Sequence, residues 1–178
     1  VYITVGIPGG FTEIVPKPLY DEDFIKMSYA GADGLHTHKS SIVDLEALVN
    51  SAHKYGLLVD AYIGMATDLH TFGIPAGTPE EVYRVAKEME NIGADMIGLM
   101  TGMSYEGVDA GQIHPLIRER LQALVEAVKV PTLAEGGINI TNFKAFKDTK
   151  VNILVIGTAI DNMVEKAAQE AVQQFLNI

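Results

Sequence analysis

Short apolar segments alternate with longer amphipathic segments along most of this chain. The apolar segments, bounded mainly by Gly, Pro and polar residues, are Val1–Gly6, Asp33–Thr37, Leu57–Gly64, Asp95–Thr101, Pro131–Glu135 and Asn152–Gly157. Runs of this kind are typical of strands buried on both faces in a parallel sheet. The pattern therefore predicts an α/β fold in which helices connect successive parallel strands by right-handed crossovers.

Start and stop signals mark the helices between these strands. Thr78, Pro79 and Glu81 have the spacing of a capping box with proline at the first helical position, and Gly93 supplies the stop. A second helix, after Ser41, has the same kind of box with Asp44 and a glycine stop at Gly56. Further helices are expected at about Glu22–Ala30, Ile113–Val128, Ile140–Lys147 and Met163–Leu176.

Two related segments, Ala30–Thr37 and Ile92–Thr101, both run from a helix end through Gly-Ala-Asp into a strand. Reuse of one unit is expected when βα units repeat. Both a closed (β/α)8 TIM barrel and an open doubly wound sheet fit this pattern. We expect a single domain over 1–178 and favour the barrel, possibly incomplete at the N-terminus, because only six strands are evident in 178 residues and a complete barrel needs at least about 200.

The chain is acidic, with 13 Lys and Arg against 23 Asp and Glu, a net charge of −10. We therefore expect no nucleic-acid partner, because such a partner requires a basic face. The chain lacks cysteine, which excludes disulfides and thiolate chemistry. It has neither an apolar stretch of about 18 residues nor a basic-then-apolar leader. We expect a cytoplasmic protein without a membrane partner, whose natural N-terminus lies upstream of Val1.

Glycines follow the last two predicted strands. Gly136 and Gly137 come directly after Glu135, and Gly157 precedes Thr158 at a predicted strand end. Glycine lets backbone approach a ligand closely, and barrels often bind phosphate in the loops after strands seven and eight. An ordinary pair of tight turns would look the same in sequence. We interpret Gly136, Gly137, Gly157 and Thr158 as a phosphate-binding cup.

Two histidines and two acids are the candidate reacting groups. His36 and His38 are two residues apart at a strand end, so both can face one side of the sheet. Asp60 interrupts an apolar strand, where a buried carboxylate is costly unless it is paired or liganded. We predict His36, His38, Lys39 and Asp60 as catalytic residues, and Asp60 with Glu135 as metal ligands. The alternatives are a solvated Lys39, a surface or capping histidine, and a Glu135 that bonds its own turn.

The segments "LLVDAYIG", "GADMIGLMTG", "PTLAEGGIN" and "NILVIGTAI" resemble the ribulose-phosphate-binding barrel superfamily. Within it, the chain is most similar to the hexulose-6-phosphate synthases and the 3-keto-L-gulonate-6-phosphate decarboxylases, over roughly Glu22 to Ile178. The resemblance implies a (β/α)8 barrel, usually dimeric, that binds a sugar phosphate and often Mg²⁺, without an organic cofactor. Its chemistry would pass through an enediolate.

The resemblance extends to particular residues. The phosphate glycines correspond to Gly136, Gly137 and Gly157, Asp60 corresponds to an acid of the synthases, and Thr101-Gly102 to their Thr-Gly pair. The Asp-x-Lys-x-x-Asp motif of these enzymes is absent, and Met100 stands where they have a histidine.

The expected function is therefore that of a carbon–carbon lyase, acting on a small phosphorylated sugar by aldol cleavage or decarboxylation. The alternatives are a metal-dependent sugar-phosphate epimerase or isomerase, and a non-catalytic barrel that binds a phosphorylated metabolite. The expected partners are the sugar phosphate and a second copy in a homodimer, and Mg²⁺ is the expected metal.

Overall fold

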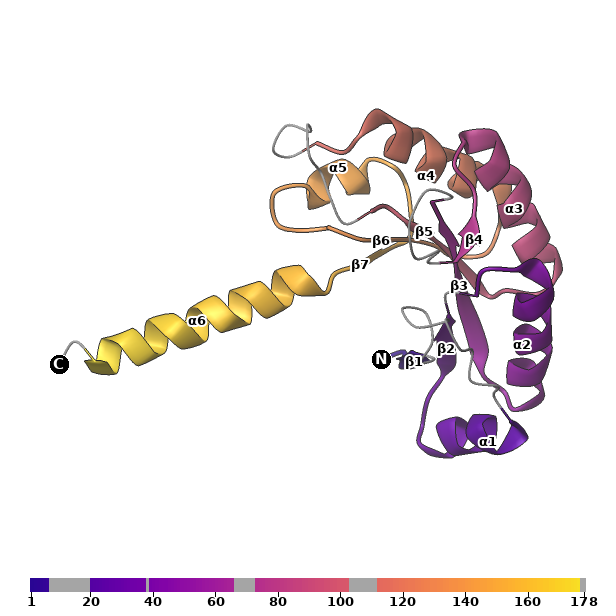
Figure 1. Cartoon of the computed structure of the whole chain (residues 1–178), viewed down its shortest axis with the longest axis horizontal. Helices are drawn as coiled ribbons and strands as arrows, with labels where there is room; N and C mark the ends of the chain where they lie inside the picture. Colours follow the sequence, from indigo (N-terminus) through magenta and orange to yellow (C-terminus); the bar gives the residue numbers. More distant parts are fainter. Residues whose placement is uncertain (7–19, 38, 66–72, 103–111, 177–178) are drawn as a thin grey trace.

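The computed structural model describes residues 1–6, 20–37, 39–65, 73–102 and 112–176. Strands and helices alternate along the chain, except that β4 follows β3 directly in the order of elements (Figure 1). The strands are β1 (Thr4–Gly6), β2 (Gly34–Thr37), β3 (Leu58–Gly64), β4 (Ile74–Pro75), β5 (Met96–Met100), β6 (Thr132–Glu135) and β7 (Ile153–Val155). The helices are α1 (Asp21–Tyr29), α2 (Ile42–Lys54), α3 (Pro79–Asn91), α4 (Pro115–Ala127), α5 (Phe143–Lys147) and α6 (Thr158–Leu176).

The strand order decides between the two predicted folds. The sheet runs β1-β2-β3-β5-β6-β7, all pairs are parallel, and the two-residue β4 pairs with β3 beside this path. A doubly wound sheet reverses its order at a switch point, and this order does not reverse. The sheet curls, with α1 to α4 along its outer side (Figure 1). The predicted barrel is confirmed in its incomplete form, as an open, curled (β/α) sheet.

Local sequence signals account for the element boundaries. The Thr78 hydroxyl accepts the Glu81 N–H at 3.2 Å, and the Glu81 carboxylate accepts the Thr78 N–H at 3.1 Å, which is the predicted capping box. Gly56 and Gly93 follow their helices with φ of 74° and 94°, a left-handed conformation that glycine adopts without strain. All six predicted strands are present. Sequence reasoning missed β4 and the first turn of α6, which begins at Thr158 rather than Met163.

The repeated Gly-Ala-Asp segment has a structural purpose. The Asp33 carboxylate accepts the N–H of Ile3 at 2.8 Å, and the Asp95 carboxylate accepts the N–H of Val59 at 2.8 Å. Each aspartate precedes its own strand, and its carboxylate satisfies a backbone amide at the start of the neighbouring strand. These contacts fix the parallel register at the amino edge of the sheet.

The two faces of the sheet differ in chemistry. Leu35, Val59, Ala61, Ile97 and Leu99 point toward the helices and belong to the buried apolar core. Because side chains alternate along a strand, the residues between them point to the concave face. That face carries polar groups, and it is the place where a barrel places its reacting side chains.

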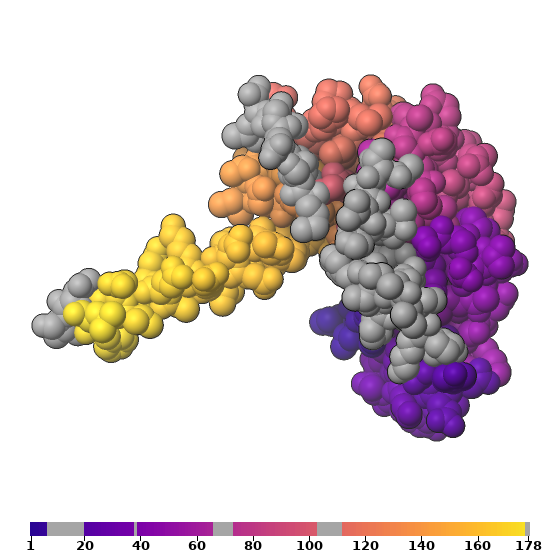
Figure 2. All heavy atoms as spheres, in the orientation of Figure 1, coloured from indigo at the N-terminus to yellow at the C-terminus, as the bar shows by residue number. Residues whose placement is uncertain are grey.

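Helix α6 differs from the other helices. It projects away from the sheet (Figures 1 and 2), and none of its residues is buried. Large apolar side chains are exposed along it, namely Ile160, Met163, Val164, Val172, Phe175 and Leu176. Across the described part of the chain, no helix combines the length and the apolar character needed to cross a membrane.

Candidate active site

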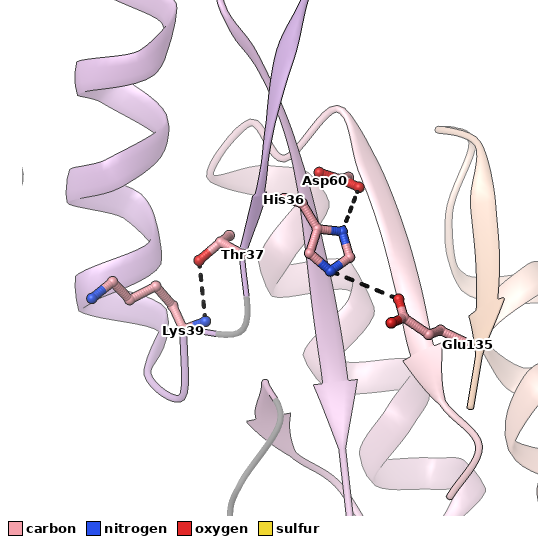
Figure 3. Close-up of polar contacts among 5 residues, drawn as sticks. All are labelled: His36, Thr37, Lys39, Asp60 and Glu135. Carbon is pink, nitrogen blue, oxygen red and sulfur yellow. Dashed lines mark hydrogen bonds and ion pairs between the residues drawn. The ribbon is translucent and has the colours of Figure 1, made fainter. Parts of the chain in front are cut away.

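The predicted residues His36, Asp60 and Glu135 meet on the concave face. His36 lies on β2 directly beside Asp60 of β3 in the parallel register, and Glu135 ends β6. The imidazole lies between the two carboxylates (Figure 3). His36 Nδ1 is 3.0 Å from Asp60 Oδ2, and His36 Nε2 is 3.7 Å from Glu135 Oε2. Three strands thus bring together a histidine and two acids that are far apart in sequence.

The electrostatics of this cluster favour a protonated histidine. Burial lowers the pKa of His36, but the hydrogen bond to Asp60 and the charges of Asp60 and Glu135 outweigh burial and raise it overall. The Asp60 side chain is only 5% exposed. Its Oδ1 atom has no hydrogen-bond partner among the described residues, so a buried oxygen remains available at the site.

Tyr62 completes the cluster and was not predicted. It lies two residues after Asp60 on β3, so both side chains face the same side, and its ring centroid is 4.8 Å from that of His36. Burial, followed by the charges of Glu135 and Asp60, raises the pKa of Tyr62, so the phenol keeps its proton. Gly98 on β5 makes room for the ring, because a Cβ there would collide with Tyr62 Cε1.

Of the two remaining predicted catalytic residues, only Lys39 is described by the structure, and it is not part of this cluster. The Lys39 side chain points away from His36 (Figure 3), although its backbone N–H donates to the Thr37 hydroxyl at 3.3 Å. His38 lies outside the described residues.

The metal prediction stays untested. The two predicted ligands, Asp60 and Glu135, lie at opposite nitrogens of the His36 imidazole, at 3.0 and 3.7 Å. In the described ranges, no group of three or more His, Asp and Glu side chains could hold a metal ion.

The two predicted glycine turns, Gly136–Gly137 after β6 and Gly157 after β7, lie at the carboxyl edge of the sheet. Strands β6 and β7 are neighbours, and Glu135 pairs with Val155 in register. Gly136 and Gly157 therefore leave adjacent strand ends, as the phosphate-cup prediction requires. Gly136 has φ of 113°, and a Cβ on it would lie 2.8 Å from the carbonyl oxygen of Gly102, so only glycine fits. Thr158 is the first residue of α6. The Gly157 carbonyl accepts the N–H groups of Ile160 and Asp161 at 2.8 and 3.3 Å, which leaves the N–H groups of Thr158 and Ala159 without a partner within the helix.

Side chains hold the Gly136–Gly137 turn from two directions. The Thr101 hydroxyl donates to the Gly136 carbonyl at 2.6 Å and approaches the Glu135 carbonyl at 3.0 Å. The side-chain amides of Asn142 and Asn139 donate to the Gly137 carbonyl at 3.1 and 3.2 Å. Both turn carbonyls are thus bound within the protein.

Comparison with known proteins places the chain in a family. No family model matches the sequence. A thiamine-phosphate synthase from Ruminiclostridium cellulolyticum is 30% identical over 163 residues, which cover 90% of this chain and 68% of that enzyme. The chain belongs to the thiamine-phosphate synthase family. This membership supports the predicted barrel enzyme, whereas it does not show the narrower hexulose-phosphate synthase assignment.

Solved structures share the fold of this chain. A mutant tryptophan synthase α-subunit from Pyrococcus furiosus matches 97% of this chain with a TM-score of 0.67 at 10% identity. The carboxyl transferase domain of Rhizobium etli pyruvate carboxylase matches 86% with a TM-score of 0.59 at 15% identity. The chain spans 62% of the first of these neighbours and 26% of the second.

Proposed function

We propose that this chain contributes the site of an enzyme that binds a small phosphorylated sugar and cleaves a carbon–carbon bond through an enediolate. The observation that carries the proposal is the position of His36 between Asp60 and Glu135, on the face whose carboxyl edge bears the two glycine turns. The turns hold the phosphate with backbone amides. The phosphate then fixes the sugar, whose reacting carbons extend over the histidine.

The groups of the cluster suit aldol cleavage. The Glu135 carboxylate takes the proton of the hydroxyl on the carbon that becomes the new carbonyl, and the carbon–carbon bond breaks. The electron pair of the broken carbon–carbon bond passes to the substrate carbonyl, which becomes an enediolate stabilised by the His36 imidazolium. His36 then gives its proton to the enediolate carbon and recovers one from Glu135. Asp60 holds the ring orientation throughout, as a carboxylate that contacts Nδ1 does.

A second candidate is the formation of thiamine phosphate. It is favoured by the 30% identity with the Ruminiclostridium cellulolyticum enzyme. Both candidates require a phosphate site at the glycine turns, so they differ only in the group that lies over His36.

Substrate turnover tests the proposal. The protein is assayed with hexulose 6-phosphates and ketogulonate 6-phosphate, with and without Mg²⁺, and separately for thiamine phosphate formation. We expect cleavage of a phosphosugar that His36→Asn reduces at least a hundredfold, the lower end of general acid–base contributions. His53→Asn is the matched control, because His53 forms a 2.8 Å pair with Asp95 at the amino edge.

Each alternative has its own outcome in this panel. Thiamine phosphate formation without cleavage supports the second candidate. Inversion of a sugar carbon supports an epimerase or isomerase. Tight phosphosugar binding without turnover supports a non-catalytic barrel and overturns the lyase proposal.

Three further proposals accompany the function. Mg²⁺ is a candidate cofactor through Asp60 Oδ1, an atom without a hydrogen-bond partner in the part of the chain that the structure describes, and Mg²⁺-dependent turnover in the panel tests it. A homodimer is a candidate assembly, and sedimentation equilibrium tests it. A cytoplasmic location is tested by fractionating the source cells.

A further inference from the structure

The two glycines after β6 create a problem for anion binding. A peptide between two glycines can rotate, because glycine accepts positive and negative φ about equally. One rotation presents the N–H group to a phosphate, whereas the opposite rotation presents the carbonyl oxygen, which repels it. The sequence Gly136-Gly137 alone therefore does not determine whether the turn accepts an anion.

Thr101 resolves the orientation of the first peptide. Its hydroxyl binds the Gly136 carbonyl at 2.6 Å. In a planar trans peptide the carbonyl and the following N–H point in opposite directions. The N–H of Gly137 therefore points away from Thr101, and Gly137 is exposed. Thr101 is itself 2% exposed, so its hydroxyl is held firmly between β5 and the turn.

Asn142 and Asn139 fix the second peptide in the same way. Both side-chain amides bind the Gly137 carbonyl, so the N–H of Ile138 points away from them. Asn142 is 4% exposed, and its own oxygen accepts the Asn139 N–H at 2.9 Å. Among the hydrogen bonds between described residues, none uses the N–H of Gly137 or Ile138.

We propose that Thr101 and Asn142 are positioning residues that hold the Gly136–Gly137 turn so that the N–H groups of Gly137 and Ile138 bind the substrate phosphate. This inference rests on the proposed phosphate site and adds to it two donors and the side chains that orient them. The Thr101 hydroxyl increases the affinity for phosphate by orienting the turn, whereas His36 carries out proton transfer.

A residue-resolved titration tests the inference. The ¹⁵N-labelled protein is titrated with inorganic phosphate while amide chemical shifts are followed. We expect the amides of Gly137 and Ile138 to move with the same dissociation constant as those of Gly157 and Thr158. If only the Gly157 and Thr158 amides move, the inference fails and the phosphate site survives. If no amide of either turn moves, both the inference and the phosphate site fail.

Variants separate positioning from stability. Thr101→Val keeps the shape but removes the hydroxyl, and we expect phosphate binding to weaken at least fivefold. Thr101→Ser should restore it to within twofold. Thr132→Val is the matched control, because Thr132 is also buried and its hydroxyl binds Asn152 at the opposite end of β6. Unchanged affinity in folded Thr101→Val, or an equal loss in Thr132→Val, overturns the proposal.

Asn142→Asp provides a second variant if Thr101→Val does not fold. It keeps the oxygen that accepts the Asn139 N–H but replaces the amide donor with an oxygen that repels the Gly137 carbonyl. We expect the dissociation constant for phosphate to rise at least fivefold. Unchanged affinity in the folded variant overturns the role of Asn142.

Discussion

Replacing Asp60 with asparagine should destabilise the protein at low pH and have little effect at high pH. The folded-state pKa of His36 is raised above the value of about 6.5 expected for an unfolded chain. The stability that protonated His36 contributes is therefore complete below about pH 6.5 and is lost as the pH rises through the folded-state pKa.

The size of the effect follows from the contact. Asp60 Oδ2 lies 3.0 Å from His36 Nδ1, and a hydrogen bond between charged partners contributes roughly 1.5–3 kcal/mol. Asp60→Asn should thus lower the free energy of unfolding by roughly 1.5–3 kcal/mol at about pH 5.5, where His36 is charged. At a pH above the folded-state pKa of His36 the imidazole is neutral, so the contact no longer joins two charged groups and the change should be within roughly 1 kcal/mol.

Urea denaturation followed by circular dichroism at both pH values measures this difference. The double variant His36→Asn/Asp60→Asn is the control, and its unfolding free energy should lack the pH-dependent loss. Equal destabilisation of Asp60→Asn at both pH values would refute the reasoning, because the charge on His36 would then contribute nothing to the contact.

Three further changes test other parts of the structure. Arg120→Met should lower the unfolding free energy by about 2–4 kcal/mol in urea denaturation, because the buried guanidinium donates to the carbonyls of Gly64 and Ala76 at 3.0 and 2.7 Å; a loss under about 0.5 kcal/mol would contradict this role. Thr78→Ala should cost about 1 kcal/mol through the lost cap of α3, and an unchanged urea midpoint would show that this cap contributes nothing. Gly136→Ala should abolish phosphate binding measured by calorimetry, because the methyl group requires the turn to move, and retained affinity would place the phosphate elsewhere.

The sequence predicts the strands and most helix ends because these depend on neighbouring residues. Capping boxes, glycine stops and uniform apolar runs are local signals, and each corresponds to an observed boundary. Asp60 was also predictable, since a carboxylate inside an apolar strand requires a structural or chemical reason. The pairing of His36 with Asp60 and Glu135 follows only from the order and register of the strands.

The residues that sequence reasoning missed depend on contacts across the fold. Tyr62 looks like an ordinary strand aromatic until Gly98 of the next strand makes room for its ring. The sequence pattern of the amphipathic helix α4 suggests that Arg120 is a surface residue, yet in the structure it is only 1% exposed. The period-two alternation after Asp60 could have indicated Tyr62, whereas no local signal distinguishes Arg120 from the other arginines.

The phosphate site is tested most directly by locating the anion in a crystal soaked with inorganic phosphate. We expect difference density within hydrogen-bond distance of the Gly137 and Thr158 backbone nitrogens, on the side of the sheet that carries His36. Density bound elsewhere, with both glycine turns empty at saturating phosphate, would contradict it.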